Sequence, residues 1–287
     1  QVQGNLARRP GGERHRVLKR RLAAAFLAGM LPALVAGASA DARAPAPSAV
    51  ARLVLEPADG VTLAWAENRL AGPIEVMLHA QGPVPASEPA LPARATVPAR
   101  GRTLVARVGP AARLQMRAVP GHPHVRSSDV EYRWPLEGAP VRVTQGWGGA
   151  SSHRDIANRH AIDLAAPPGT PVLAARDGVV MQVEAGFSEG APDLELDGRA
   201  NFIRILHDDG TMALYAHLDS NGLAVRPGER VRRGQRLGLS GNTGFSTGPH
   251  LHFVVQANRG MRLESVPFRM FGPGGILRFR DPGAEPE

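Results

Sequence analysis

The stretch His250–Gln256 reads HLHFVVQ, in which two histidines one residue apart lead into an apolar run. A short apolar run rich in β-branched and aromatic residues predicts a buried β-strand. Side chains at positions i and i+2 of a strand point to the same face, about 6.6 Å apart along the backbone. We therefore expect His250 and His252 to lie side by side on one face of a sheet, with Leu251 on the other.

Similar short runs surround this stretch throughout the C-terminal half of the chain. Gly or Pro punctuates most gaps between them, and no segment keeps a helical period. Further strands are expected at 141–145, 171–174, 178–184, 201–207, 211–217 and 231–239. The Gly- and acid-rich stretch 185–200 is expected to be a loop. These patterns predict an antiparallel β-sheet domain over residues 139–275, followed by a tail over 276–287.

A second set of short runs precedes a proline-flanked boundary between Pro135 and Pro140. The runs cover 51–55, 61–65, 74–78, 103–108, 114–119 and 130–134. Short strands at this close spacing, separated by Pro/Gly turns, indicate a small β-sandwich or barrel-like domain over residues 50–135. The fold class is therefore predicted to be mainly β, with two domains.

The first forty residues have the layout of an export signal. A basic stretch meets the apolar run Leu22–Ala38, and the small-residue triplet Ala38-Ser39-Ala40 follows. The apolar run of about 17 residues is marginal for a permanent membrane span. We expect a removed signal over 1–40, with a retained membrane anchor as the alternative, and a flexible leader over 41–49. The expected location is the periplasm or cell envelope, or outside the cell.

The charge distribution argues against a nucleic-acid partner. The chain has a net charge of +8, but residues 1–40 hold seven Lys/Arg and one acid. The remaining 247 residues carry 27 basic and 25 acidic side chains. Once the signal is set aside, the body therefore lacks the basic patch that nucleic-acid binding requires.

The histidines are the first candidates for chemistry. Six of the ten lie between positions 153 and 252, and the chain has no cysteine, so a metal would have to be held by His, Asp or Glu. A catalytic zinc site uses three protein ligands and one open position. A His-x-His pair alone is weak support, because His122-Pro123-His124 has the same spacing in a Pro/Gly connection. Two surface histidines are the alternative for such a pair.

Several separate motifs strengthen the signal. Residues 161–180 read AIDLAAPPGTPVLAARDGVV, residues 214–218 read LYAHL, and GNTG at 241–244 is followed by GPHLHF at 248–253. In this order and spacing they resemble the lysostaphin/LytM-type zinc endopeptidases over residues 139–258. The resemblance implies a β-sheet catalytic domain of that type, a Zn²⁺ cofactor, and the peptide crosslinks of bacterial peptidoglycan as substrate.

The resemblance also implies roles for matching residues. Asp163 and His252 would be zinc ligands. His217 and His250 would be catalytic residues that orient or deprotonate the water and stabilise the tetrahedral intermediate. The first ligand departs from the commonest pattern, in which a His stands four residues before the Asp, because that position is Arg159 here. His153 fits a subgroup with a Ser-His step further upstream and is favoured over His160, the alternative.

A non-catalytic wall-binding or hydrolase-activating protein on the same fold is the rival interpretation. Such relatives lose ligands or catalytic histidines, and this chain retains Asp163, His217, His250 and His252. No residue between 50 and 135 has catalytic spacing, so that domain could bind the wall or a partner, or cover the groove. Among the remaining residues, His207 is expected to be solvated at a hairpin turn, Tyr215 to be packing, and Trp147 to be either core or groove wall.

Overall fold

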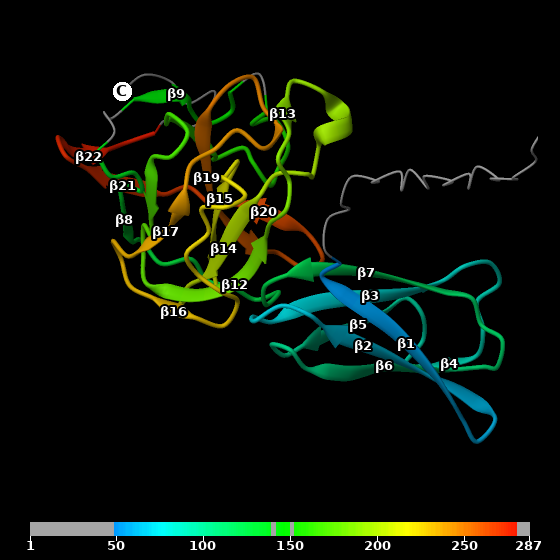
Figure 1. Cartoon of the computed structure of the whole chain (residues 1–287). Helices are drawn as coiled ribbons and strands as arrows, with labels where there is room; N and C mark the ends of the chain where they lie inside the picture. The colour runs from blue at the N-terminus through cyan, green and yellow to red at the C-terminus, as the bar shows by residue number, and fades with distance from the viewer. Residues whose placement is uncertain (1–48, 139–141, 150–151, 280–287) are drawn as a thin grey trace, which may run out of the picture. The chain divides into compact units, whose positions relative to one another are not determined.

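A computed structural model describes residues 49–138, 142–149 and 152–279, all within one compact unit, Arg43–Glu287. The described residues are almost entirely β, with one short 3-10 turn, η1 (Leu194–Leu196), so the predicted fold class is confirmed (Figure 1). The expected signal, most of the leader and the end of the tail lie outside the described residues. Within the described residues, no helix has the length and apolarity needed to cross a bilayer.

The N-terminal domain contains two antiparallel sheets (Figure 1). One has the order β1 (Ala51–Ala58), β2 (Val61–Asn68), β6 (Arg102–Val108) and β4 (Ser87–Glu88); the other has the order β5 (Ala93–Val97), β3 (Ile74–Ala80) and β7 (Leu114–Pro120). Asp59 and Gly60 both have positive φ, 42° and 77°, which closes the two-residue hairpin between β1 and β2. Buried side chains from both sheets, including Ala64, Ile74 and Val105, form one core.

The C-terminal domain is built on an eight-stranded sheet. Its order is β16 (Arg230–Val231), β12 (Gly178–Glu184), β14 (Phe202–Leu206), β15 (Met212–Ala216), β19 (His250–Asn258), β10 (Ile162–Ala165) and β9 (Val143–Gln145), with β20 (Leu263–Ser265) beside β19. Every neighbouring pair in it is antiparallel, as the sequence predicts.

Small sheets surround this main sheet. The pairs are β11 (Pro171–Leu173) with β17 (Arg236–Leu239), β13 (Gly190–Ala191) with β18 (Gly244–Phe245), and β21 (Arg269–Gly272) with both β8 (Glu131–Arg133) and β22 (Gly275–Leu277). The stretch 185–200, expected to be a loop, thus contains β13 and η1. The start of the expected tail contributes to β22.

Strand alternation separates the two faces of the main sheet. Ile162, Tyr215 and Phe253 point to one face and are completely buried in the C-terminal core. Asp163 directly follows Ile162, and His252 directly precedes Phe253, so both project from the opposite face. The large apolar side chains fix the register, and the register in turn fixes which polar side chains share the other face.

The strand expected at 130–134 packs in the C-terminal core rather than in the N-terminal domain. β8 pairs in parallel with β21, and the buried Tyr132 and Trp134 belong to the C-terminal cluster. The last strand of the N-terminal domain is therefore β7. The physical reason is that Tyr132 packs against Phe253 and Phe268 of the C-terminal core.

Contacts between the two domains involve the end of the main sheet remote from His250. The buried Met181 and Met212 belong to the N-terminal core cluster. The amide of Asn258, the last residue of β19, donates to the carbonyl oxygen of Gly121 at 3.0 Å. The N-terminal domain is thus held at the opposite end of β19 from the two histidines.

Candidate metal centre

Strand pairing brings Asp163 and His252 together. β10 and β19 are antiparallel with Asp163 opposite His252, and His252 Nδ1 lies 3.0 Å from Asp163 Oδ1. Directly opposed side chains on one face of an antiparallel pair are neighbours. The two residues, 89 positions apart in sequence, meet because the apolar alternation on both strands leaves no other register.

His153 reaches the same carboxylate from the loop that follows β9. Its Nε2 lies 3.2 Å from Asp163 Oδ1, and its Nδ1 lies 2.8 Å from the carbonyl oxygen of Gly146. Because a carbonyl oxygen only accepts, Nδ1 carries the hydrogen of the neutral ring and Nε2 carries the lone pair. A lone pair on Nε2 therefore faces a carboxylate oxygen, and a cation between them would stabilise this arrangement.

His153, Asp163 and His252 form a compact group of potential ligands. One donor atom from each lies within 4.8 Å of the others, and all three residues are buried. Imidazole nitrogens and a carboxylate oxygen are donors that zinc accepts, in the three-ligand arrangement of catalytic sites. Burial alone would raise the pKa of Asp163, but the contacts of its carboxylate with His153 and His252 hold that pKa well below its usual range. The donors present therefore fit a divalent metal such as zinc.

Two further histidines lie beside this group. His250 Nε2 lies 3.6 Å from Asp163 Oδ1, and its Nδ1 lies 2.8 Å from the carbonyl oxygen of Gly248. His217 follows β15, and its Nδ1 lies 2.7 Å from the carbonyl oxygen of Thr243. The ring centroids of His217 and His250 are 4.5 Å apart. Both rings are thus fixed through Nδ1.

The surroundings of His217 keep its ring neutral. Burial, followed by the nearby His250 and His252, lowers the pKa of His217 to about 3. The residue also has a φ of 63°, a left-handed conformation that is rare for side chains other than Gly, Asn and Asp. Such backbone strain persists only where the surrounding structure fixes it, and it is concentrated at functional sites.

His160, the alternative first ligand, does not join this group. Its Nδ1 lies 2.9 Å from Ser265 Oγ, and its ring packs edge-on against Trp147 with centroids 5.0 Å apart. The structure thus places His153 beside Asp163, and it places His160 against β20.

His207 directly follows β14 at the β14–β15 hairpin, but the expectation that it is solvated is wrong. The side chain is buried, its Nδ1 bonds the carbonyl oxygen of Asp177 at 2.7 Å, and it packs edge-on against Tyr132. Turn sequence alone misleads here, because β8 packs over the hairpin. His122 and His124 are exposed, as their Pro/Gly setting indicates.

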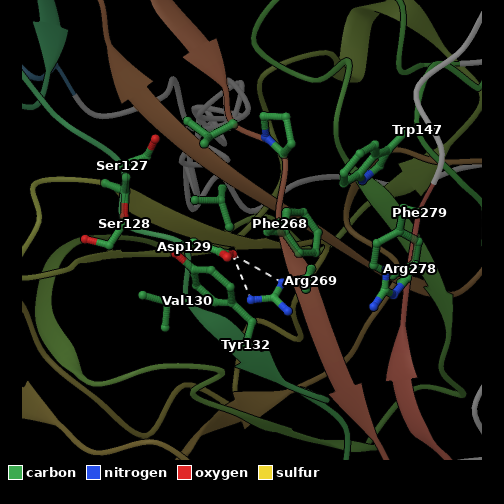
Figure 2. A pocket seen from close by; sticks show the side chains of 14 residues that line it. Ser127, Ser128, Asp129, Val130, Tyr132, Trp147, Phe268, Arg269, Arg278 and Phe279 are labelled. Atoms are coloured by element: carbon green, nitrogen blue, oxygen red, sulfur yellow. Dashed lines mark hydrogen bonds and ion pairs between the residues drawn. The ribbon is translucent and has the colours of Figure 1, made fainter. Parts of the chain in front are cut away.

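A pocket of about 380 Å³ lies on the core side of the main sheet (Figure 2). Aromatic rings of Tyr132, Phe268, Trp147 and Phe279 line it, together with the ion pair between Asp129 and Arg269. Val255 also lines it and, by strand alternation, points away from His252. This pocket is therefore separate from the metal-ligand group, and Trp147 packs among aromatic side chains beside it.

Sequence reasoning missed Gln145, which contacts the carboxylate of this group. Gln145 pairs with Asp163 across β9 and β10, and its amide bonds the Asp163 carboxylate. Asn201 is fully buried, and its amide donates to the carbonyl oxygens of Phe187 and Leu218. A polar residue such as Gln145 at a strand end could have been linked to Asp163 only if the pairing register of β9 and β10 had been known. That register shifts beside Asp163, which no sequence pattern reveals.

A buried His/Asp/His group on the face of an antiparallel sheet, with two further histidines beside it, defines a candidate metallohydrolase site. Residues 157–263 match the family model described as Peptidase family M23. The chain therefore carries an M23 peptidase domain of the lysostaphin/LytM type, as its motifs indicate. The matched region contains Asp163, His217, His250 and His252, and His153 lies just before it.

Relatives match through this domain. The peptidoglycan DD-endopeptidase ShyA of Vibrio cholerae is 41% identical over 126 residues, 43% of this chain and 26% of that protein. The DD-carboxypeptidase/endopeptidase Mpg of Neisseria meningitidis is 41% identical over 97 residues, 34% of this chain and 20% of that protein. Among solved structures, lysostaphin from Staphylococcus simulans is 33% identical over 41% of this chain and 43% of that chain, with a TM-score of 0.32. The chain thus spans about a quarter or less of the length of ShyA and Mpg.

Proposed function

We propose that this protein is an exported zinc metalloendopeptidase that hydrolyses the peptide crosslinks of bacterial peptidoglycan. The observation that carries the proposal is the buried group of His153, Asp163 and His252, beside which His217 and His250 are held. The M23 match and relatives such as the peptidoglycan DD-endopeptidase ShyA support the reaction and the substrate class.

In this proposal, His153 and His252 hold zinc through ring nitrogens and Asp163 holds it through a carboxylate oxygen. A zinc ion in such a site lowers the pKa of a bound water towards about 7 and polarises the carbonyl to be attacked. His160 is left out of the ligand set because its ring is engaged by Ser265. Gly146 supports the set by fixing the His153 ring through its carbonyl oxygen.

His217 and His250 would move the protons that hydrolysis requires. In hydrolysis the amide C–N bond breaks, the carbonyl carbon gains the hydroxyl group of water, and the leaving nitrogen gains a proton. A neutral imidazole with Nδ1 held by a carbonyl can accept a proton at Nε2, and the resulting cation can donate it or stabilise negative charge on oxygen. The chain has no HExxH sequence, so it lacks the Glu base found on such helices, and histidines take that role.

The proposed location follows from the segment before residue 41. A basic stretch, the apolar run Leu22–Ala38 and a small-residue triplet have the layout of an export signal. Peptidoglycan lies outside the cytoplasmic membrane, so an enzyme that cuts it must be exported. The periplasm or cell envelope is therefore the proposed site of action, and nucleic acid is not a proposed partner.

The test measures zinc content and crosslink cleavage in the full chain, in His153→Ala and in His160→Ala. The proposal expects about one zinc per chain, with crosslinked muropeptides converted to monomers, and loss of both only in His153→Ala. Loss only in His160→Ala would move the first ligand to His160. A protein that binds wall material but neither holds zinc nor cleaves would instead be the non-catalytic wall-binding protein.

A further inference from the structure

The end of β9 places one amide beside the proposed ligand Asp163. Gln145 Nε2 lies 3.0 Å from Asp163 Oδ2 and 2.9 Å from Ser152 Oγ. A carboxylate oxygen only accepts, so the amide nitrogen of Gln145 is the donor to Asp163. Because the backbones of Gln145 and Asp163 are paired across β9 and β10, the amide approaches the carboxylate from a fixed direction.

The two oxygens of Asp163 therefore have different surroundings. Oδ1 lies 3.2 Å from His153 Nε2 and 3.0 Å from His252 Nδ1, the nitrogens proposed as ligands. Oδ2 accepts the hydrogen bond from Gln145. Turning the carboxylate so that both oxygens face the histidines would break the hydrogen bond from Gln145, and the loss of this part-buried bond costs free energy.

We infer that Gln145 is a positioning residue that commits Asp163 to offering a single oxygen, Oδ1, to the metal. The inference rests on the proposed function, because it assumes that Asp163 is a metal ligand. A catalytic zinc site keeps one coordination position open, and a carboxylate that binds through both oxygens would occupy it. By holding Oδ2, Gln145 preserves the open position for water and substrate.

The same amide also connects Asp163 to the loop that carries His153. Ser152, the second partner of the Gln145 amide, directly precedes His153, whose ring is fixed by the carbonyl oxygen of Gly146. Gln145 thus lies between two of the three proposed ligands. Groups that orient metal ligands in this way typically affect metal affinity by about 10–100-fold.

The experiment compares the full chain with Gln145→Met, which keeps the length of the side chain and removes the donor. Gln235→Met is the matched control, because the Gln235 amide bonds Glu229 and takes no part in the Asp163 group. Zinc affinity is measured by competition with a chelator. The proteins are also loaded with cobalt(II), whose visible absorption weakens as its coordination number rises. Thermal unfolding of the metal-free proteins measures the effect on the fold itself.

The expected result for Gln145→Met is zinc binding about 10–100-fold weaker, with a weaker cobalt absorption and a metal-free melting temperature close to that of the parent. Gln235→Met should match the parent in both metal readouts. Unchanged zinc affinity and an unchanged cobalt spectrum in a folded Gln145→Met protein would overturn the inference. If that variant does not fold, Gln145→Ala carries the same test, since Gln145 is only half-buried.

Neither readout depends on catalysis. A parent protein that binds zinc normally but leaves crosslinks uncut would refute the proposed function, and the comparison of Gln145→Met with the parent would still decide the role of Gln145.

Discussion

His217 Nδ1 lies 2.7 Å from the carbonyl oxygen of Thr243, and His217 holds this contact with a backbone φ of 63°. Thr243 is itself anchored, because its Oγ1 donates to the carbonyl oxygen of Leu218 at 2.9 Å. Thr243 therefore contacts both the ring of His217 and the backbone of the next residue, Leu218, and this holds the ring in place. This relationship holds the His217 ring in one orientation, as its proposed role in proton transfer requires.

Removing either proposed catalytic histidine should separate catalysis from metal binding. His217→Ala and His250→Ala are each expected to retain zinc and to lose about 10²–10⁴-fold in kcat, the usual contribution of a proton-transfer group. Zinc content and muropeptide cleavage are measured on the same preparations. A variant that also loses zinc would show that its histidine is a ligand.

The buried amide of Asn201 should affect both stability and activity. Asn201→Ala removes the hydrogen-bond partner of both the backbone N–H and the carbonyl oxygen of the buried Phe187, whereas the carbonyl oxygen of Leu218 keeps the hydroxyl of Thr243. Each unpaired group costs about 1–3 kcal/mol, so the melting temperature should fall clearly. Because Leu218 follows His217, kcat should fall while zinc content stays unchanged. Asn221→Ala, at an exposed position, is the control and should match the parent in both measurements.

His207 should make the folded state sensitive to mild acid. Burial lowers the pKa of His207 to about 4 from an ordinary value of 6.5. Below pH 6.5 the unfolded chain binds a proton that the folded protein does not bind until the pH approaches 4. Stability is therefore lost as the pH falls through this window, and this one residue contributes up to about 3 kcal/mol of the change.

The corresponding variant is His207→Gln, whose amide can still donate to the carbonyl oxygen of Asp177. Urea unfolding is measured at several pH values from about 4.5 to about 7.5, which spans the interval between the two pKa values of His207. The free energy of unfolding of His207→Gln should fall less steeply with decreasing pH than that of the parent. His122→Gln changes an exposed histidine and should leave the pH dependence as it is. Parallel curves for the parent and His207→Gln would contradict the assignment.

The contact between the two domains should contribute to stability without controlling the site. Met212 is fully buried in the N-terminal core cluster although it belongs to β15 of the main sheet. Met212→Ala should cost about 2–5 kcal/mol of unfolding free energy, because it leaves a cavity. Cleavage per folded molecule should stay near the parent level, since Met212 and His217 flank opposite ends of β15. Leu194→Ala, at a side chain that is 79% exposed, provides the neutral comparison.

Much of the fold could be predicted from residue patterns. The apolar run at His250–Gln256 correctly indicated a strand, and the punctuated apolar runs indicated β-sheet structure in both domains. The order of the motifs also indicated that Asp163, His217, His250 and His252 belong to one site. These signals are local or depend on spacing, so a sequence carries them directly.

Features that depend on tertiary packing could not be read in this way. The strand at 130–134 looks like the last strand of the first domain, but its partner β21 lies more than a hundred residues later. His207 looks solvated until β8 covers it. Gln145 becomes informative only once the irregular register of β9 and β10 is known. In each case the deciding contact is with a segment distant in sequence.

The proposed ligands come from distant parts of the chain, with 89 positions between Asp163 and His252 and 10 between His153 and Asp163. An ion held by all three would close these segments into loops, much as a covalent tie does, and would bind only the folded chain. At a free concentration a thousand times its Kd, it would add about 4 kcal/mol to the free energy of unfolding. Zinc supply would then govern how long each molecule survives proteolysis, as well as how fast it works.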